Sequence, residues 1–188
     1  MNLVIFGPPG AGKGTQSSFI VKKFNLFQLS TGELLRNEIK NNSKLGQEIS
    51  TIINSGNLVS DKIVSNLIEK YISNINYKNK LIFDGYPRNL SQARNLDYLL
   101  EKTDQQINIV LKLSVSLETI VKRISERRNL EKRADDNEKI AVKRFQTYEK
   151  NIKPVIDFYK DTGLLKVVNG EASITEINSE ISALIKTI

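Results

Sequence analysis

The sequence predicts an α/β protein in which a five-stranded parallel sheet carries helices on both faces. Three observations indicate this class: five short apolar runs, helical spacing of apolar residues between them, and a regular alternation of the two patterns. Strands that alternate with helices pair in parallel, because each helix returns the chain to the same edge of the sheet. In such folds, ligands bind beyond the carboxyl ends of the strands.

Each expected strand is a short, mostly apolar run. The strands are expected at residues 2–6, 27–30, 80–84, 107–113 and 164–168. Between them, apolar stripes with helical spacing are interpreted as core-facing helix sides: Ile63, Val64, Leu67, Ile68, Tyr71 and Ile72; Leu117, Ile120, Val121 and Ile124; Ile174, Ile177, Ile181, Leu184 and Ile188. Two segments interrupt the alternation: residues 30–59, expected to be mostly helical, and the charged stretch "SERRNLEKRADD", of which residues 126–136 break the pattern.

Composition narrows the possible chemistry. The 188 residues fit one domain with a substantial core. The chain has no cysteine and no histidine, which excludes disulfides and thiolate metal sites and removes the commonest general base. No structural zinc is therefore expected. Any catalysis has to rely on Asp, Glu, Lys, Arg, backbone groups or a hard cation.

The charge balance favours polyanionic partners. The formal net charge is +7, supplied by 20 lysines and 8 arginines. A nucleic-acid-binding or regulatory protein is one alternative, but the sequence lacks a basic cluster with interleaved aromatic residues, so no nucleic-acid partner is expected. No run approaches the length of a membrane span, and "MNLVIFGPPG" resembles a strand rather than a signal peptide. A cytoplasmic location is expected.

A phosphate-binding loop follows the first expected strand directly. "GPPGAGKGT" spans residues 7–15, with Gly12-Lys13 at the G-x-x-x-x-G-K spacing from Gly7. Glycines let backbone N–H groups turn inward and form a concave anion site, and a helix starting near Lys13 adds its positive N-terminal dipole. Gly14 stands where such loops usually carry Ser or Thr. A mostly hydrated Mg²⁺ is therefore expected, since this ion gives up water reluctantly.

A second site is indicated by "DGYPRNLSQA", residues 84–93. Asp84 ends an apolar strand, where its carboxylate can orient Mg²⁺ through water. Gly85 and Pro87 set a tight turn from which Arg88 emerges. Gln92 lies four residues further, one helical turn on, and its amide offers both a donor and an acceptor to an adenine edge.

"STGELLR", residues 30–36, contributes a further cation. Ser30 or Thr31 is expected to cap a helix, with Glu33 behind it. Arg36 falls on the same helix face as Gly32, four residues earlier. The small residue leaves room for a ligand beside the guanidinium.

With these residues in place, the sequence closely resembles the adenylate kinase family over nearly the whole chain. The resemblance rests on six motifs in order: "GPPGAGKGT", "LSTGELLR", "SGNLVSD", "DGYPRNLSQA", "VKRISERR" and "RADD", with Arg144 eleven residues after Arg133. It implies a P-loop kinase fold forming one nucleoside monophosphate kinase domain over residues 1–188. Its parts would be a core (1–29, 60–125 and 137–188), a helical NMP-binding insertion (30–59) and a short lid (126–136).

The resemblance also implies an activity: a monomeric, Mg²⁺-dependent enzyme that reversibly converts ATP and AMP into two ADP, in adenine nucleotide homeostasis. The implied catalytic residues are Lys13, Arg88, Arg123, Arg127, Arg133 and Arg144. The implied ATP-binding residues are Gly10, Ala11, Gly12, Lys13, Gly14, Thr15, Arg123, Arg127 and Ala172. The implied AMP-binding residues are Thr31, Gly32, Arg36, Asn57, Leu58, Val59, Gly85, Tyr86, Pro87, Arg88, Gln92, Arg133 and Arg144.

Arginine usage agrees with this resemblance. Six of the eight arginines fall on motif positions, and only Arg94 and Arg128 do not. A planar guanidinium grips a phosphate in a fixed, bidentate geometry that Lys cannot match. Asn89 departs from the family pattern, because it is more typical of the related uridylate/cytidylate kinases. A UMP/CMP kinase is thus the alternative, although Thr31 and Gln92 match the adenylate-specific pattern.

The charged stretch at residues 126–136 is interpreted as a closing element rather than a solvated loop. Arg123 and Arg127 are one helical turn apart and share a helix face. Arg133 and Arg144 approach from the other side. Closure over the site excludes water that would otherwise compete for the phosphoryl group. The stretch is too short, and lacks the cysteines, to form the family's larger metal-pinned lid.

Overall fold

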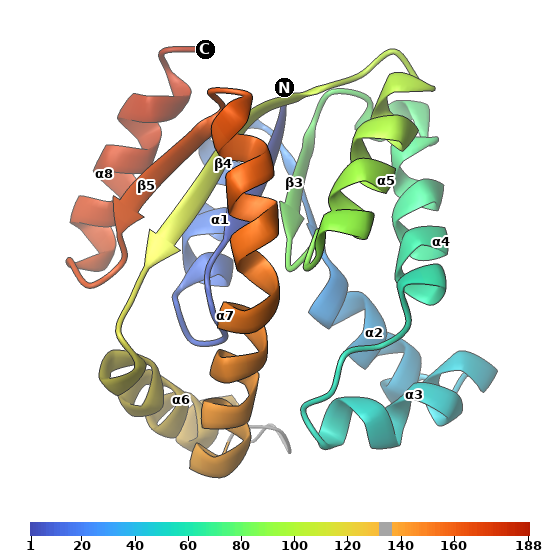
Figure 1. Cartoon of the computed structure of the whole chain (residues 1–188), viewed down its shortest axis with the longest axis vertical. Helices are drawn as coiled ribbons and strands as arrows, with labels where there is room; N and C mark the ends of the chain where they lie inside the picture. Colours follow the sequence, from blue (N-terminus) through green and yellow to red (C-terminus); the bar gives the residue numbers. More distant parts are fainter. Residues whose placement is uncertain (132–136) are drawn as a thin grey trace.

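The computed structural model describes residues 1–131 and 137–188, the backbone alone for residues 129–131. Its centre is a parallel sheet of five strands in the order β2-β3-β1-β4-β5 (Figure 1). The strands are β1 (Asn2–Phe6), β2 (Phe27–Ser30), β3 (Leu81–Asp84), β4 (Ile107–Ser114) and β5 (Leu165–Asn169). The predicted five-stranded parallel sheet is confirmed, with strand ends shifted by at most one residue from the predicted ranges.

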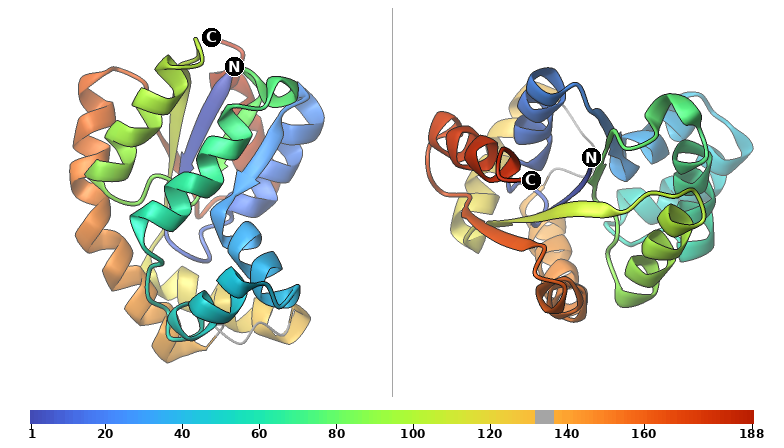
Figure 2. Two further views of the ribbon diagram at one scale, coloured as in Figure 1. Left: turned by 90° about the vertical axis from the view of Figure 1, so that its right-hand side faces the viewer. Right: turned by 90° about the horizontal axis from the view of Figure 1, so that it is seen from above.

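Helices cover both faces of this sheet, as predicted (Figure 2). On one face lie α1 (Lys13–Phe24) and α8 (Ile174–Ile185), which pack on Leu3 and Ile5 of β1. On the other lie α4 (Asp61–Ile72), α5 (Leu90–Glu101) and α7 (Glu138–Asp161), which pack on Val4 and Phe6. Successive side chains of a strand point to opposite faces, so a short continuous apolar strand serves two cores.

Three further helices lie beyond the carboxyl ends of the strands (Figure 1). They are α2 (Thr31–Lys40), α3 (Lys44–Asn54) and α6 (Leu117–Glu131), and a 3₁₀ turn at Ile75–Tyr77 precedes β3. Two helices thus occupy the predicted insertion. Ser30 caps α2 by accepting a hydrogen bond from the Glu33 N–H at 3.4 Å. Because α6 continues to Glu131, residues 126–131 of the predicted lid are helical, and residues 132–136 lie outside the described residues.

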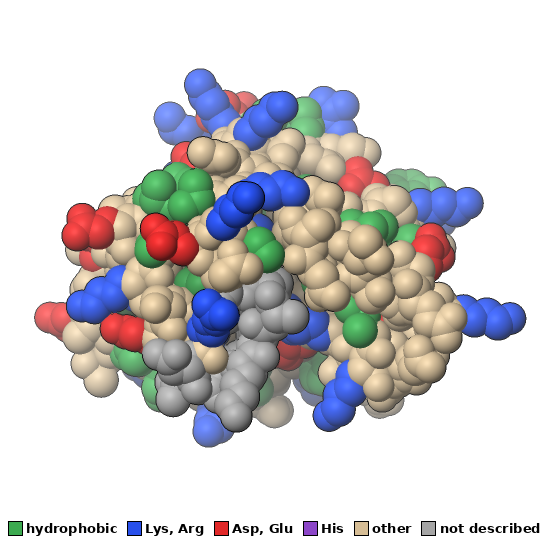
Figure 3. All heavy atoms as spheres, turned by 90° about the horizontal axis from the view of Figure 1, so that it is seen from below, with side chains coloured by type: hydrophobic (Ala, Val, Ile, Leu, Met, Phe, Trp, Pro, Cys, Tyr) green, Lys and Arg blue, Asp and Glu red, His purple; other side chains and the backbone are tan. Residues whose placement is uncertain are grey.

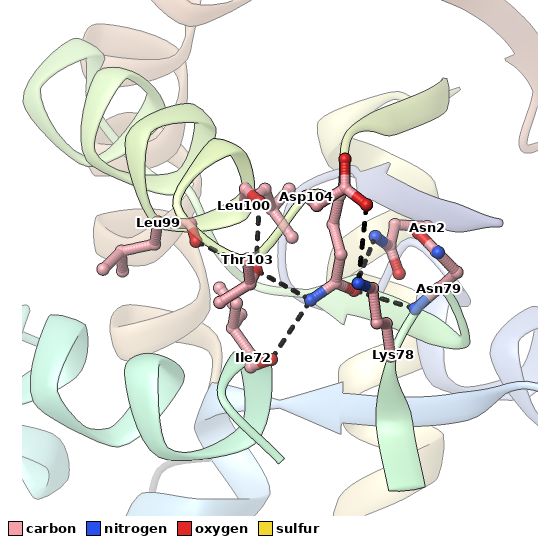
Figure 4. A network of polar contacts seen from close by, with 9 residues as sticks. Asn2, Ile72, Lys78, Asn79, Leu99, Leu100, Thr103 and Asp104 are labelled. Carbon is pink, nitrogen blue, oxygen red and sulfur yellow. Dashed lines mark hydrogen bonds and ion pairs between the residues drawn. The ribbon is translucent and has the colours of Figure 1, made fainter. Parts of the chain in front are cut away.

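The amino end of the sheet is closed by a network of polar contacts in which buried amides take part beside the ion pair of Lys78 and Asp104 (Figure 4). The Gln105 Oε1 atom accepts from the Asn79 N–H at 2.8 Å and from Asn2 Nδ2 at 3.3 Å. Its Nε2 group donates to the Ile72 carbonyl at 3.1 Å and to Thr103 Oγ1 at 2.9 Å. A single buried amide therefore ties together the ends of several elements that are far apart in sequence.

Among residues 1–131 and 137–188, no helix is both long enough and apolar enough to span a bilayer.

Candidate functional site

A cavity of about 780 Å³ lies at the carboxyl end of the sheet. Figure 3 views the molecule from this side, where Lys and Arg side chains are spread over the surface. Most of the predicted site residues line the cavity: Gly10, Ala11, Gly12, Lys13, Gly14, Thr15, Gly32, Arg36, Asn57, Leu58, Val59, Asp84, Gly85, Pro87, Arg88, Arg123, Arg127, Arg144 and Ala172. Segments spread over more than 160 positions of the sequence thus share one surface.

The phosphate-binding loop forms one wall of this cavity. It leaves β1 and enters α1, whose N-cap is Gly12 with φ 91°. That left-handed conformation strains any residue with a Cβ, which explains the glycine. The Ala11 N–H donates to the Pro8 carbonyl at 3.1 Å, which closes a tight turn. The first turn of α1 carries no acidic residue, so its N–H groups and positive dipole are available to an anion.

Lys13 lies folded over this loop. Its Nζ atom donates to the Gly7 carbonyl at 2.7 Å and to the Pro8 carbonyl at 3.0 Å. Burial lowers the pKa of Lys13 to about 8, and the positive charges of Arg88 and Arg144 act in the same direction. A phosphate would favour the charged ammonium and oppose this effect.

Arg88 is held by neutral oxygens opposite the loop. Its Nε donates to the Gly85 carbonyl at 2.7 Å, and its Nη2 donates to Thr31 Oγ1 at 3.3 Å. Gly85 allows this close packing, because a Cβ there would lie 3.0 Å from Thr31 Oγ1 and 3.2 Å from Arg88 Nη2. Burial lowers the pKa of Arg88 to about 10, with further lowering by the charge of Arg144. The guanidinium remains protonated at neutral pH.

The other cavity arginines come from three helices. Arg36 lies on α2 beside Gly32. A Cβ added at Gly32 would lie 3.2 Å from the Nη1 atom of Arg36, so the predicted proximity of this glycine and Arg36 is observed. Arg123 and Arg127 lie on α6, and the Arg123 Nη1 is 3.5 Å from the Ala11 carbonyl. Arg144 lies on α7. Cations from α2, α6, α7 and the β3–α5 turn thus converge on one cavity.

Asp84 brings a carboxylate to the same cavity. It ends β3, is 7% exposed, and accepts a hydrogen bond at its Oδ2 from Gln28 Nε2 at 2.9 Å. Gln28 is part of β2, and the pairing of β2 with β3 places Ser30 beside Asp84. Within the described part of the chain, no three acidic, His or Cys groups gather as a metal cage. One oxygen ligand fits a Mg²⁺ ion that keeps water and phosphate ligands, and fits no ion that requires a protein cage.

Three predicted residues lie behind the cavity wall instead of on it. Thr31 is 2% exposed and its hydroxyl donates to the Gly85 carbonyl at 2.9 Å. Tyr86 is fully buried in the core near Ser65, and burial raises the pKa of its hydroxyl. Gln92 is 3% exposed, and both ends of its amide have protein partners. Arg133 lies outside the described residues.

One helix face was not recognised from the sequence. Arg144, Tyr148 and Asn151 of α7 line the cavity with the i, i+4, i+7 spacing of a single face. Burial raises the pKa of the Tyr148 hydroxyl, which has no hydrogen-bond partner among the described residues. The spacing from Arg144 is the signal that would have found them. Gln28 gave no local signal, because its role depends on the neighbouring strand.

Comparisons with known proteins agree on one family. A family model described as adenylate kinase matches residues 5–164. A protein named adenylate kinase from Pelagibacter ubique (strain HTCC1062) is 41% identical over 212 aligned residues, with 99% of this chain and 100% of the relative covered. One of the same name from Stenotrophomonas maltophilia (strain K279a) is 40% identical, with 99% and 100% covered. Another from Prochlorococcus marinus (strain NATL2A) is 42% identical, with 94% of each chain covered.

Proposed function

The chain belongs to the adenylate kinase family, and we propose that it reversibly transfers the terminal phosphoryl group of ATP to AMP, giving two ADP. The observation that carries this proposal is the meeting of two phosphate-binding surfaces in one cavity. One is the backbone nest before α1, and the other is the cluster of guanidinium groups opposite it. Two phosphate-bearing ligands can thereby be held end to end.

ATP is assigned to the side formed by the loop and α6. The N–H groups of Gly10–Thr15 would surround its phosphates, with Lys13 bridging the outer two. Arg123 and Arg127 would contact the phosphates from the adjacent helix face, and the backbone near Ala172 would contact the adenine. All of these residues line the cavity, which supports the assignment.

AMP is assigned to the opposite side. Arg36, Arg88 and Arg144 would bind its phosphate, with Arg133 joining them from the undescribed stretch. The Gly32, Asn57–Val59 and Gly85–Pro87 segments would enclose the nucleoside. Thr31 and Tyr86 lie behind this surface, so we assign them to its support. Gln92 lies behind it as well, and we assign its amide to the base because it offers both a donor and an acceptor.

Mg²⁺ is assigned to the junction of the two sides. Asp84 would bind its water ligands, and Gln28 would hold the carboxylate in place through its 2.9 Å hydrogen bond. A bound Mg²⁺ supplies charge neutralisation at the transferring phosphoryl group. The side chains of this protein would align the acceptor oxygen of AMP with the phosphorus atom that is transferred.

The reaction requires no general base. A phosphate monoester has a second pKa of about 6, so the attacking oxygen of AMP is largely ionised at neutral pH. This agrees with a chain that lacks histidine. The enzyme's task is positioning and electrostatic stabilisation of the equatorial oxygens, for which fixed guanidinium groups are suited.

Closure of two elements would complete the site. We assign residues 30–59 as the AMP-binding insertion and residues 126–136 as a short lid on the core formed by 1–29, 60–125 and 137–188. A contact already joins α7 to the insertion, since Lys143 Nζ donates to the Ser55 carbonyl at 2.9 Å. Excluding water in this way protects the phosphoryl group from hydrolysis.

AMP is the favoured acceptor. The named relatives are adenylate kinases, so the UMP/CMP alternative raised by Asn89 is not favoured. In the structure Asn89 is the N-cap of α5, with its Oδ1 accepting from the Gln92 N–H at 2.8 Å. Capping is a structural reason for Asn at this position and is independent of the acceptor base.

A coupled assay tests the proposal. We expect ADP only when ATP, AMP and Mg²⁺ are all present, and potent inhibition by a dinucleoside pentaphosphate, in which two adenosines share one phosphate chain. ADP formed from ATP without AMP would indicate an ATPase. Calorimetry should give one inhibitor per chain, competing with both ATP and AMP; competition with ATP alone would contradict a two-sided cavity.

A further inference from the structure

We propose that Asp61 is a specificity-determining positioning residue, which fixes the orientation of the Gln92 amide and thereby selects bases with an adenine-like hydrogen-bonding edge. This inference rests on the proposed function, because it concerns the base of the phosphoryl acceptor. It assigns a role to Asp61, the first residue of α4 and the last residue of the motif "SGNLVSD", to which the sequence alone assigns no role of its own.

The two ends of the Gln92 amide have partners of opposite kind. Its Oε1 accepts from the Arg88 backbone N–H at 2.7 Å, and its Nε2 donates to Asp61 Oδ1 at 2.7 Å. A backbone N–H can only donate, and an ionised carboxylate can only accept. Turning the amide over would set N–H against N–H and oxygen against oxygen. Its orientation is therefore fixed by the chemistry of its neighbours.

Asp61 is itself held by Asn89. The Asn89 Nδ2 group donates to both carboxylate oxygens of Asp61, at 3.1 and 2.9 Å. At its other end, Asn89 Oδ1 accepts from the Gln92 backbone N–H at 2.8 Å. The first residue of α4 and the N-terminus of α5 are thus joined in a closed ring of hydrogen bonds. Such a ring limits the positions that the Gln92 side chain can adopt.

A fixed amide presents a fixed order of donor and acceptor. After the two contacts above, one N–H remains on Nε2 and one lone pair remains on Oε1. Adenine has an acceptor nitrogen beside an amino donor on its pairing edge, and cytosine has the same order. Guanine and uracil have the reverse order, an N–H donor beside a carbonyl acceptor. Because the acceptor phosphate is anchored by arginines, the base cannot turn round to compensate.

Gln92 does not itself line the cavity, but a residue that it contacts does. Its side chain is 3% exposed, yet Arg88, which it holds, lines the cavity. So does Val59, two residues before Asp61. Asp61 is exposed, so its replacement removes the acceptor without opening the core.

The test compares acceptor panels for Asp61→Ala and the wild-type protein. With ATP and Mg²⁺ present, kcat/KM is measured for AMP, CMP, GMP and UMP. We expect about a tenfold fall for AMP, since a hydrogen bond to a charged group contributes about 1.5 kcal/mol. The preference for AMP over GMP and over UMP should fall by a similar factor, while the AMP to CMP ratio should change by less than about threefold. The KM for ATP should not change.

Two variants control for folding effects. Asp61→Asn keeps an acceptor oxygen of the same shape and should restore most of the discrimination. Lys62→Ala, at the next and exposed position of α4, should behave as wild type. An equal fall for all four acceptors, or no change, would overturn the role of Asp61 and leave a merely structural contact. A wild-type protein that phosphorylates none of them would instead refute the proposed function.

Discussion

The two ends of the sheet carry polar groups of different charge. The carboxyl end gathers cations: Lys13 and Arg88 are bound there by neutral carbonyl and hydroxyl oxygens, and burial lowers the pKa of each. The amino end gathers neutral amides: Asn2 is fully buried, Gln105 is 8% exposed, and both are bonded to each other and to the main chain. Both ends are polar, but the two cations of the carboxyl end are only partly buried, and the two ends differ in charge.

Under the proposed function, the difference separates the residues that stabilise the fold from those that bind substrate. A saturated neutral network contributes to stability and specifies a unique arrangement. Buried cations cost free energy unless an anion offsets them. At the carboxyl end, substrate phosphates are suited to that role, so binding energy is available for catalysis. Substitutions at the carboxyl end should therefore lower activity more than stability, and substitutions at the amino end should lower stability more than activity.

The largest effect is expected from Arg88→Ala. Loss of a guanidinium aimed at the transferring charge should lower kcat by about 1000-fold, the upper range for removing one such donor. The free energy of unfolding should change by less than about 1 kcal/mol, because relief of a buried cation offsets the lost hydrogen bonds. Steady-state kinetics and urea denaturation measure the two quantities. Arg94→Ala, an exposed arginine on α5, is the matched control and should leave both unchanged.

Gln105→Ala should show the reverse signature at the amino end. It leaves the Asn79 N–H and other buried partners without their acceptor or donor, so the free energy of unfolding should fall by about 3 kcal/mol. Turnover at 25 °C should stay within about twofold of wild type, provided the protein is folded. The neighbouring and exposed Gln106 supplies the control, Gln106→Ala, which should melt as wild type does. A large kinetic defect in folded Gln105→Ala would break the division between the two ends.

Gln28→Leu tests how the Asp84 carboxylate is held in the cavity. Without its hydrogen bond, Asp84 should hold the hydrated ion less well, and the Mg²⁺ concentration for half-maximal activity should rise about tenfold. Calorimetric titration of Mg²⁺ into the nucleotide complex should give the same shift. Gln47→Leu, on the exposed surface of α3, is the control. Unchanged Mg²⁺ dependence would show that Gln28 does not support the ion.

The smallest expected effect is the uptake of protons by Lys13 when ATP binds. Its pKa of about 8 in the free protein lies below its ordinary value, so part of the population is neutral at pH 8. Bound phosphates favour the charged form and raise that pKa, and therefore ATP binding should take up a fraction of a proton between about pH 8 and 9. Calorimetry in two buffers of different ionisation enthalpy measures the uptake. Lys13→Met should abolish it; equal uptake in this variant would assign the proton elsewhere.

The same pKa predicts a change in the stability of the ligand-free protein. The folded state binds fewer protons at Lys13 than the unfolded state does between pH 8 and about 10.5. The free energy of unfolding of wild type, relative to Lys13→Met, should therefore rise with pH over that window. A fall over the same window would have the wrong sign and would contradict a lowered pKa.

Local patterns were sufficient for much of the fold and for the phosphate loop. All five strands, the helix beginning at Lys13 and a helix cap at Ser30 or Thr31 were predicted, and the structure places the cap at Ser30, because alternation, loop glycines and capping residues act within a few positions. The charged stretch was less well predicted. A lid is predicted from Glu126 onward, whereas α6 continues to Glu131, because a stretch rich in Arg and Glu has no apolar stripe from which a helix is predicted.

What the sequence determined by itself is therefore the chemistry and order of the parts: a glycine-rich loop before a helix, arginines at motif positions, and strands whose carboxyl ends face the cavity. What only the tertiary structure decided is which groups face the cavity and which support it. For Gln92, the tertiary structure decided the partners of its amide, the backbone of Arg88 and the carboxylate of Asp61, while its contact with a ligand stays a prediction. Tyr148 and Asn151 became cavity residues only when α7 packed beside the loop. The physical reason is the sequence distance over which each interaction acts. Capping and turn formation depend on neighbours in sequence, whereas burial and side-chain hydrogen bonds depend on residues that folding brings together.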